Sequence, residues 1–151
     1  MISLTPIGHV KSPRDDLSDD DWGAVRARIE LTPDFDPECL DGIEEFSHAE
    51  ILFCFDRVDP AKVNRGARHP RGNTAWPKVG IFAQRGKDRP NRIGSTIVAI
   101  AARNGRVLEV VGLDAIEGTP VLDIKPVMAE FLPRGPVRQP AWSHELMREY
   151  W

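Results

Sequence analysis

The sequence predicts an all-β protein, a small β-barrel of about six to seven strands with a short C-terminal helix. Short apolar runs separated by glycine and proline indicate many short strands, one dipeptide is typical of a tight hairpin, and long helical periodicity is scarce. The 151 residues are the length of one domain. We expect a barrel domain over residues 1–131 and a proline-rich tail with a short helix over residues 132–151.

The first half of the chain supplies three expected strands. Ile2–Val10 is apolar and ends in a Ser-Pro turn. Ala24–Leu31 alternates loosely, with its apolar side chains on one face, as in a half-buried strand. Pro33–Gly42 is rich in turn residues, with one helical turn expected at Pro37–Leu40. Ile51–Phe55 is short and continuously apolar, which predicts a strand buried on both faces.

The second half supplies the remaining elements. Its expected strands are Val79–Gln84, Arg92–Arg103, Arg106–Leu113 and Thr119–Pro126. Asn104-Gly105 separates the second and third of these and predicts a two-residue hairpin turn. Ala141–Tyr150 places apolar side chains at helical spacing, so we expect a helix that packs on the body or on a partner chain rather than carrying chemistry.

Composition narrows the class of protein. Hydrophobic residues make up 41% and charged residues 28%, and no apolar run approaches the ~20 residues of a membrane span. The N-terminus lacks the pattern of a signal peptide, and two cysteines do not make a disulfide framework. These features exclude membrane, collagen-like, disordered and disulfide-knot proteins and predict a cytoplasmic location.

Charge is distributed unevenly. The net charge is −3, yet residues 60–92 hold 9 Lys and Arg against Asp88 alone. Glycine and proline in the same stretch predict loops, and loop-borne guanidinium groups suit phosphate or carboxylate recognition. A solvated surface whose charges sort by chance remains the alternative. The arginines concerned are Arg65, Arg68, Arg71, Arg85, Arg89 and Arg92.

The sequence lacks the common catalytic and nucleotide-binding motifs. The chain contains neither a dinucleotide-binding glycine pattern, nor a phosphate-binding P-loop, nor a nucleophile elbow. His48 and Glu50 match one half of the zinc deaminase signature, but the cysteine half is missing. We therefore expect no metal site.

Two segments contain charged and polar side chains whose positions indicate a function in addition to folding. The first, Val79–Ser95, places Arg85, Arg89 and Asn91 in one tight loop. The second, Gly112–Pro126, places Asp114, Asp123 and Lys125 at the ends and on the face of adjacent strands. Charged groups in or near a sheet are costly unless they are paired or used. An ordinary ion pair between Asp123 and Lys125 on a solvated face is the alternative to a functional role.

Together with Ile7–Pro13 and Leu40–His48, these segments resemble the TsaA-like family, also called the TrmO family, of tRNA methyltransferases. The resemblance covers about residues 5–127 in family order. It implies a small β-barrel that binds S-adenosylmethionine without a dinucleotide-binding sheet, usually as a homodimer. The implied reaction is N6-methylation of threonylcarbamoyladenosine beside the anticodon, so the implied partner is the tRNA anticodon loop.

The resemblance also implies site residues. Cofactor contacts are expected from Trp22, Gly23, Asp56, Arg57, Arg85, Ser95, Gly112, Leu113, Asp114 and Ala115. The loop Asp19–Gly23 stands where many members have Pro-Arg-Gln, which makes Trp22 a candidate to stack on the adenine. The candidate catalytic residues are Asn91, Asp114, Asp123 and Lys125, and the candidate substrate-binding residues are Arg71, Arg89 and Arg92.

The expected roles follow from the chemistry of methyl transfer. A carboxylate at Asp114 suits a cationic cofactor, and Asn91 can accept from the adenine amine while Asp123 orients it or takes its proton. Two other functions stay open at this point. One keeps the cofactor but uses another RNA or a small-molecule acceptor, and the other is a module that binds S-adenosylmethionine without turnover.

Overall fold

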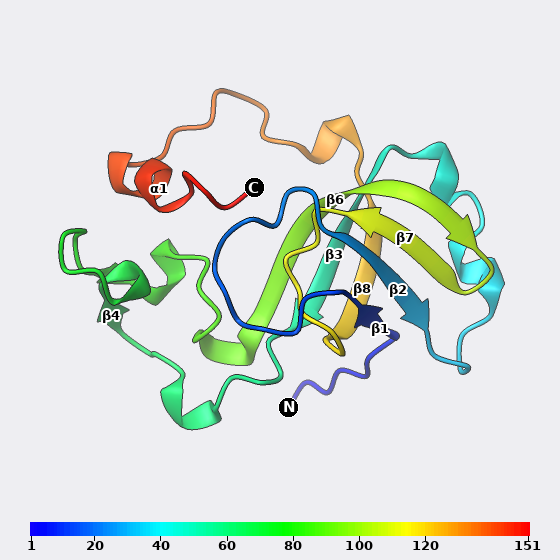
Figure 1. Ribbon diagram of the computed structural model, residues 1–151, viewed down its shortest axis with the longest axis horizontal. Coiled ribbons are helices and arrows are strands. Elements are labelled where there is room, and N and C mark those ends of the chain that lie inside the picture. The colour runs from blue at the N-terminus through cyan, green and yellow to red at the C-terminus, as the bar shows by residue number, and fades with distance from the viewer.

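The computed structural model describes residues 1–151 and contains a closed barrel of six antiparallel strands, which confirms the predicted all-β barrel with one short helix (Figure 1). Around the barrel the order is β1-β2-β7-β6-β3-β8. The barrel strands are β1 (Gly8–Lys11), β2 (Arg26–Leu31), β3 (His48–Cys54), β6 (Ile93–Asn104), β7 (Val107–Val111) and β8 (Pro120–Pro126). A separate two-stranded sheet pairs β4 (Ala67–Arg68) with β5 (Val79–Gly80), and the helix is α1 (Ala141–Leu146).

Alternate side chains along the strands fill the barrel. On β2, Ala27, Ile29 and Leu31 are buried, as the loose alternation predicted. On β3 the prediction of burial on both faces was wrong, because Ile51 and Phe53 point into the core while Leu52 is only half-buried. A closed barrel has one dry face, so even a continuously apolar strand alternates in burial.

Two other strand predictions need correction. The expected strand Ile2–Val10 is reduced to β1, because Ile2 and Leu4 are exposed and only the later residues pair. The expected strand Val79–Gln84 ends after two residues and continues as a 3₁₀ turn. The buried Gln84 amide donates to the carbonyl oxygen of Val79 at 3.0 Å, which folds the segment back on itself.

The predicted hairpin is confirmed with its turn shifted by one residue. Asn104 pairs with Val107, so the two connecting residues are Gly105 and Arg106. Gly105 has φ +58°, a left-handed conformation that glycine adopts without steric cost. The predicted helical turn at Pro37–Leu40 is also present, as a 3₁₀ turn.

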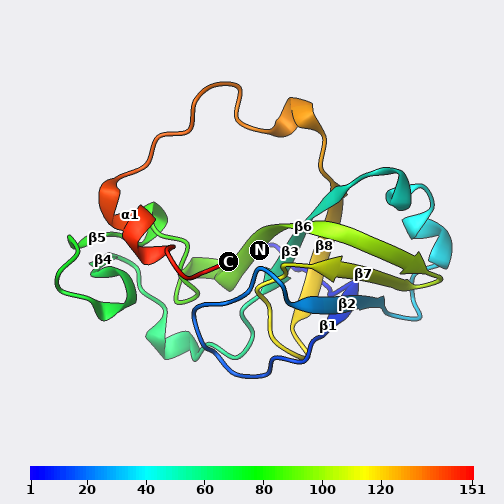
Figure 2. The same cartoon turned by 45° about the horizontal axis from the view of Figure 1, so that its top comes forward.

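The strand directions gather three loops at one end of the barrel. Residues 12–25 connect β1 to β2, residues 55–92 connect β3 to β6, and residues 112–119 connect β7 to β8. β8 leaves at the opposite end, and the chain then returns outside the barrel to bring α1 back over the loops (Figure 2). None of the helices combines the length and hydrophobicity that crossing a bilayer requires.

Candidate functional site at the loop end of the barrel

Asp114 lies at the centre of a polar cluster at this end. It follows Gly112, whose φ of +89° turns the chain after β7, and it stands between the buried residues Leu113 and Ala115. The Thr96 hydroxyl donates to one carboxylate oxygen of Asp114, and the Tyr150 phenol donates to the other. Residues from β6, the β7–β8 loop and the C-terminal segment therefore meet at one carboxylate.

Arg85 is hydrogen-bonded to Ser95, the residue before Thr96 on β6. Its Nη2 donates to the carbonyl oxygen of Ser95 at 2.6 Å, and the Ser95 hydroxyl donates to Glu50 Oε1 at 2.8 Å. Ser95 and Thr96 are consecutive, so a cation and an anion are bound to adjacent residues of one strand. Thr96 itself is buried.

The C-terminal segment covers the loop that holds Trp22 and Gly23. The backbone N–H of Trp22 donates to the Tyr150 carbonyl oxygen at 2.8 Å. Trp22 is buried, and the Arg14 guanidinium lies 3.6 Å from the centroid of its ring, so Arg14 occupies one face. A Cβ added to Gly23 would lie 2.7 Å from the carbonyl carbon of Trp151. The Trp22 ring is therefore already largely enclosed, and stacking of adenine on it stays a prediction.

All three expected substrate-binding arginines make contacts within or between the loops. Arg71 lies 3.2 Å from Asp20 Oδ1, Arg89 donates to the Gln84 carbonyl at 2.7 Å, and Arg92 donates to the Val58 carbonyl at 2.9 Å. These contacts leave further N–H groups on each guanidinium, because five donors are available per arginine. Substrate binding by the three arginines stays a prediction.

Three more expected site residues lie at the same barrel end. Arg57 donates to the Glu117 carbonyl at 3.1 Å and so links the loop after β3 to the β7–β8 loop. Its neighbour Asp56 is exposed. Asn91 is exposed, has φ +64° and forms no side-chain hydrogen bond within the chain, which leaves its amide free for a ligand.

Asp123 and Lys125 lie away from this cluster. Both are on β8, paired with Leu52 and Glu50 of β3, and their side chains form an ion pair of 3.2 Å. The side chains are 49% and 59% exposed, so the geometry is that of the ordinary surface pair left open by the sequence. Neither contacts Asp114 or Asn91, and their catalytic roles stay predictions.

Two residues of the cluster, Thr96 and Tyr150, were missed by sequence reasoning. Thr96 is a polar residue at an inward-facing position of a strand, which was a usable signal beside the predicted Ser95. Tyr150 was assigned to a packing helix over Ala141–Tyr150, but α1 ends at Leu146, and Tyr150 follows it and accepts a backbone hydrogen bond from Trp22. Burial, together with the adjacent Asp114 carboxylate, raises the pKa of the Tyr150 phenol, so the phenol is the hydrogen-bond donor.

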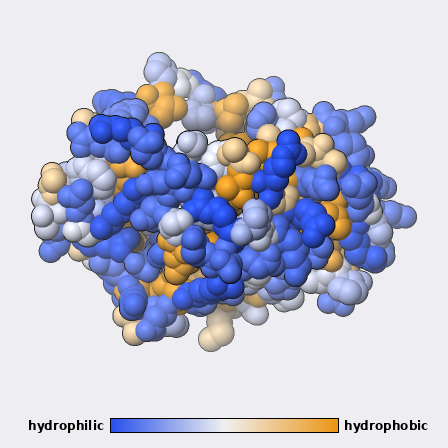
Figure 3. Space-filling view, in the orientation of Figure 1, coloured by the Kyte–Doolittle hydropathy of each residue, from blue (hydrophilic) through white to orange (hydrophobic).

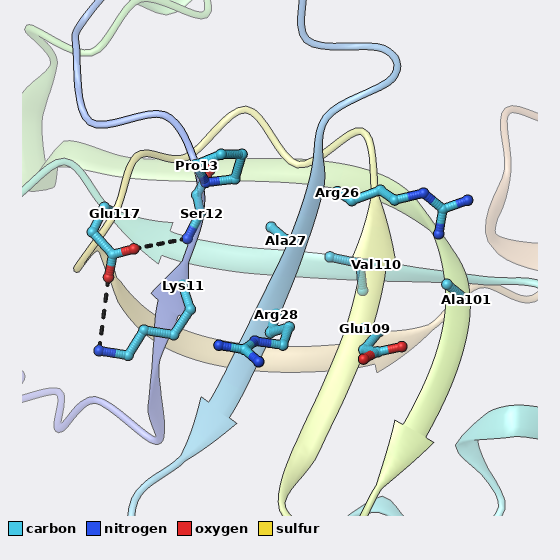
Figure 4. A pocket seen from close by; sticks show the side chains of 10 residues that line it. All are labelled: Lys11, Ser12, Pro13, Arg26, Ala27, Arg28, Ala101, Glu109, Val110 and Glu117. Atoms are coloured by element: carbon cyan, nitrogen blue, oxygen red, sulfur yellow. Dashed lines mark hydrogen bonds and ion pairs between the residues drawn. The ribbon is translucent and has the colours of Figure 1, made fainter.

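A separate hollow lies on the outer surface of β1, β2 and β7 (Figure 4). It contains no expected site residue. Glu117 joins it to the loop end, since its carboxylate accepts from the Ser12 backbone N–H at 2.9 Å and lies 3.7 Å from Lys11 Nζ. Arg28 and Glu109 face each other across β2 and β7, so acidic and basic groups alternate over this surface. No three His, Cys, Asp or Glu side chains are grouped so that they can hold a metal ion.

Comparisons with known proteins identify relatives along most of the chain. A Pyrococcus abyssi protein named "Probable S-adenosyl-L-methionine-binding protein" is 38% identical over 143 residues, 91% of this chain and 74% of that protein. The human tRNA (adenine(37)-N6)-methyltransferase is 40% identical over 107 residues, 71% of this chain and 23% of that protein. The crystal structure of TrmO from Pseudomonas aeruginosa matches with a TM-score of 0.76 and 29% identity, covering 94% of this chain and 62% of that one.

Several curated relatives are longer than the matched region. The chain spans 56%, 23% and 34% of the lengths of three of them. The family model of the tRNA-methyltransferase O N-terminal domain nevertheless matches residues 11–131, which include all six barrel strands except the first three residues of β1. The chain therefore belongs to the family of tRNA-methyltransferase O N-terminal domains.

Proposed function

We propose that the chain is an S-adenosylmethionine-dependent tRNA methyltransferase that methylates N6 of threonylcarbamoyladenosine at position 37, next to the anticodon. The observation that carries the proposal is the pair of opposite charges, Arg85 and Asp114, bound to adjacent residues of β6. The family membership and the name of the human relative support the reaction type. The names of the archaeal relatives support the cofactor.

The donor set fits this cofactor. Its methionine part carries a carboxylate beside an ammonium and a sulfonium, so it needs one cationic and one anionic group close together. Arg85 supplies the first and Asp114 the second, while Leu113 and Ala115 hold the Asp114 turn against the core. When bound, S-adenosylmethionine supplies a methyl group on a positively charged sulfur. The protein's main contribution is to position donor and acceptor.

The acceptor base is assigned to the exposed side of the same loops. The free amide oxygen of Asn91 accepts a hydrogen bond from the N6–H of the base and orients it. Bases of an anticodon loop are unstacked and accessible, which suits a site built from loops. Arg71, Arg89 and Arg92 retain free N–H groups for the threonylcarbamoyl carboxylate or for phosphate. Asp123 and Lys125 lie on the outer face of β8, where they pair with each other.

The test is methyl transfer from labelled S-adenosylmethionine to tRNA with and without threonylcarbamoyladenosine. We expect label only in the modified tRNA, and a loss of at least about tenfold in rate for Asp114→Asn, because one charge interaction near the transferred group is removed. Asp34→Asn, an exposed carboxylate at the opposite end of the barrel, is the matched control. Equal labelling of both tRNAs, or of neither, would refute the proposed acceptor.

A cofactor-binding module without turnover is the second candidate, since the archaeal relative is named for binding alone. It predicts that S-adenosylmethionine binds but no tRNA is labelled. The dependence of tRNA affinity on salt separates the two, because contacts to phosphate weaken as salt is added.

The remaining assignments concern assembly and location. We infer a homodimer, supported by exposed apolar side chains such as Phe82 and Ile97. The face of the molecule in Figure 3 is largely hydrophilic, with several apolar areas among the polar ones. Analytical ultracentrifugation tests the dimer. A cytoplasmic location is supported by two free cysteines, Cys39 and Cys54.

A further inference from the structure

We propose that Tyr150 is a positioning residue that, with Thr96, orients the Asp114 carboxylate toward the positively charged sulfur of the cofactor. The proposal rests on the function proposed above and extends its site to the C-terminal segment. Neither residue belongs to the cofactor-binding set expected from the family motifs.

First, both carboxylate oxygens of Asp114 accept a hydrogen bond. Thr96 donates to one and Tyr150 to the other. A carboxylate bound at one oxygen can still rotate about its side-chain torsion, whereas one donor on each oxygen restricts that rotation. The remaining lone pairs of both oxygens then keep one direction, which is how supporting groups orient a ligand-binding side chain.

The second step is the anchoring of Tyr150 itself. The Trp22 N–H donates to the Tyr150 carbonyl at 2.8 Å, and the Asp21 N–H donates to the Glu149 carbonyl at 2.9 Å. Further back, Trp76 Nε1 donates to Glu145 Oε2 at 2.8 Å. The two backbone hydrogen bonds hold the phenol at a fixed place beside the loop before β2, whereas the Trp76 contact is made from α1 and does not involve residues 149–150.

The third step is the protonation of the phenol. Burial raises the pKa of Tyr150, and the Asp114 carboxylate raises it further, so the phenol keeps its proton at neutral pH. It therefore donates to Asp114 without adding charge. The negative charge of Asp114 stays available for a cation.

The consequence is a preference between two ligands of nearly equal shape. S-adenosylmethionine carries a sulfonium, whereas S-adenosylhomocysteine is a neutral thioether. An oriented carboxylate favours the first through charge, while contacts with the adenosine are shared by both. A residue that only packs the C-terminal segment would change both affinities by the same factor.

The experiment measures the dissociation constants of both ligands by titration calorimetry for the full chain. Tyr150→Phe keeps the ring and the backbone contacts and removes only the hydroxyl. We expect the preference for S-adenosylmethionine over S-adenosylhomocysteine to fall at least about tenfold, as for the loss of one hydrogen bond to a charged group. Glu145→Ala is the matched control, because it removes the Trp76 contact without touching Asp114, and its preference should equal that of the wild type.

The outcomes separate the two proposals. An unchanged preference in Tyr150→Phe, or an equal weakening of both ligands, overturns the role of Tyr150 and leaves the methyltransferase proposal standing. Failure of the wild-type chain to bind either ligand overturns both. A lower preference in Tyr150→Phe with an unchanged one in Glu145→Ala supports the positioning role even if the acceptor proves to be another molecule.

Discussion

The docking of the C-terminal segment makes one substitution especially informative, Gly23→Ala. A Cβ at this position would lie 2.7 Å from the carbonyl carbon and 3.2 Å from the Cα of Trp151. Both neighbours are backbone atoms, so the added methyl is accommodated only if the segment moves. We expect the C-terminal segment to move away from the loop before β2 and to lose the backbone hydrogen bonds Trp22–Tyr150 and Asp21–Glu149.

The magnitude follows from those two bonds. Each backbone hydrogen bond contributes about 1 kcal/mol net, so the local free energy of opening falls by about 2 kcal/mol. Because about 1.4 kcal/mol is a factor of ten, the Asp21 and Trp22 amides should exchange roughly 30-fold faster. Hydrogen exchange read by mass spectrometry over a peptide containing both amides measures this.

A matched glycine provides the control for this substitution. Gly135 has open space around its Cα, so Gly135→Ala adds the same methyl without a steric conflict and should leave the exchange unchanged. Unchanged protection of Trp22 in Gly23→Ala would refute the docked position of residues 149–151, and with it the proposed role of Tyr150.

Gly94→Ala should destabilise the barrel, because its Cβ would lie 2.5 Å from the Phe53 ring. Overpacking of this kind costs about 2 kcal/mol, so we expect Tm to fall by about 4–8 °C. An unchanged Tm would contradict the packing. Arg65→Ala should lower the slope of log Kd for tRNA against log salt by about 1, and an unchanged slope would remove Arg65 from the RNA contacts. Burial raises the pKa of the Cys54 thiol, so at pH 8 Cys54 should react with iodoacetamide more slowly than the exposed Cys39; equal rates by mass spectrometry would contradict its burial.

The sequence predicts the barrel well because the features that specify each strand and turn lie within a few neighbouring residues. Alternation over Ala24–Leu31 and the glycine of the β6–β7 turn act within a few residues, and both features are present in the structure. The strand expected at Val79–Gln84 fails for a nonlocal reason, since the Gln84 amide also donates to the carbonyl of Arg68, 16 residues earlier. A pattern within one segment carries no information about such a partner.

The same distinction applies to the site. The strand pattern predicts Asp114 at a strand end, where the structure has it, but its partner Tyr150 lies 36 residues later, beyond a proline-rich stretch with no regular pattern. Only the return path of the chain outside the barrel brings the two together. Asp123 and Lys125 show the converse, because their spacing of two residues on one strand is sufficient to pair them on the outer face.

The structure also removes the apparent conflict between the two interpretations of the basic stretch 60–92. Arg68 and Arg71 form ion pairs with neighbouring carboxylates, Arg68 with Asp88 at 2.9 Å. Arg85, Arg89 and Arg92 instead donate to backbone carbonyls, and a neutral carbonyl satisfies a donor without cancelling the charge. These three guanidinium groups therefore stabilise the loops and still present a positive potential to an anionic ligand. Under the proposed function, the same side chains serve loop architecture and anion recognition, so mutating any of the three should affect stability and binding together.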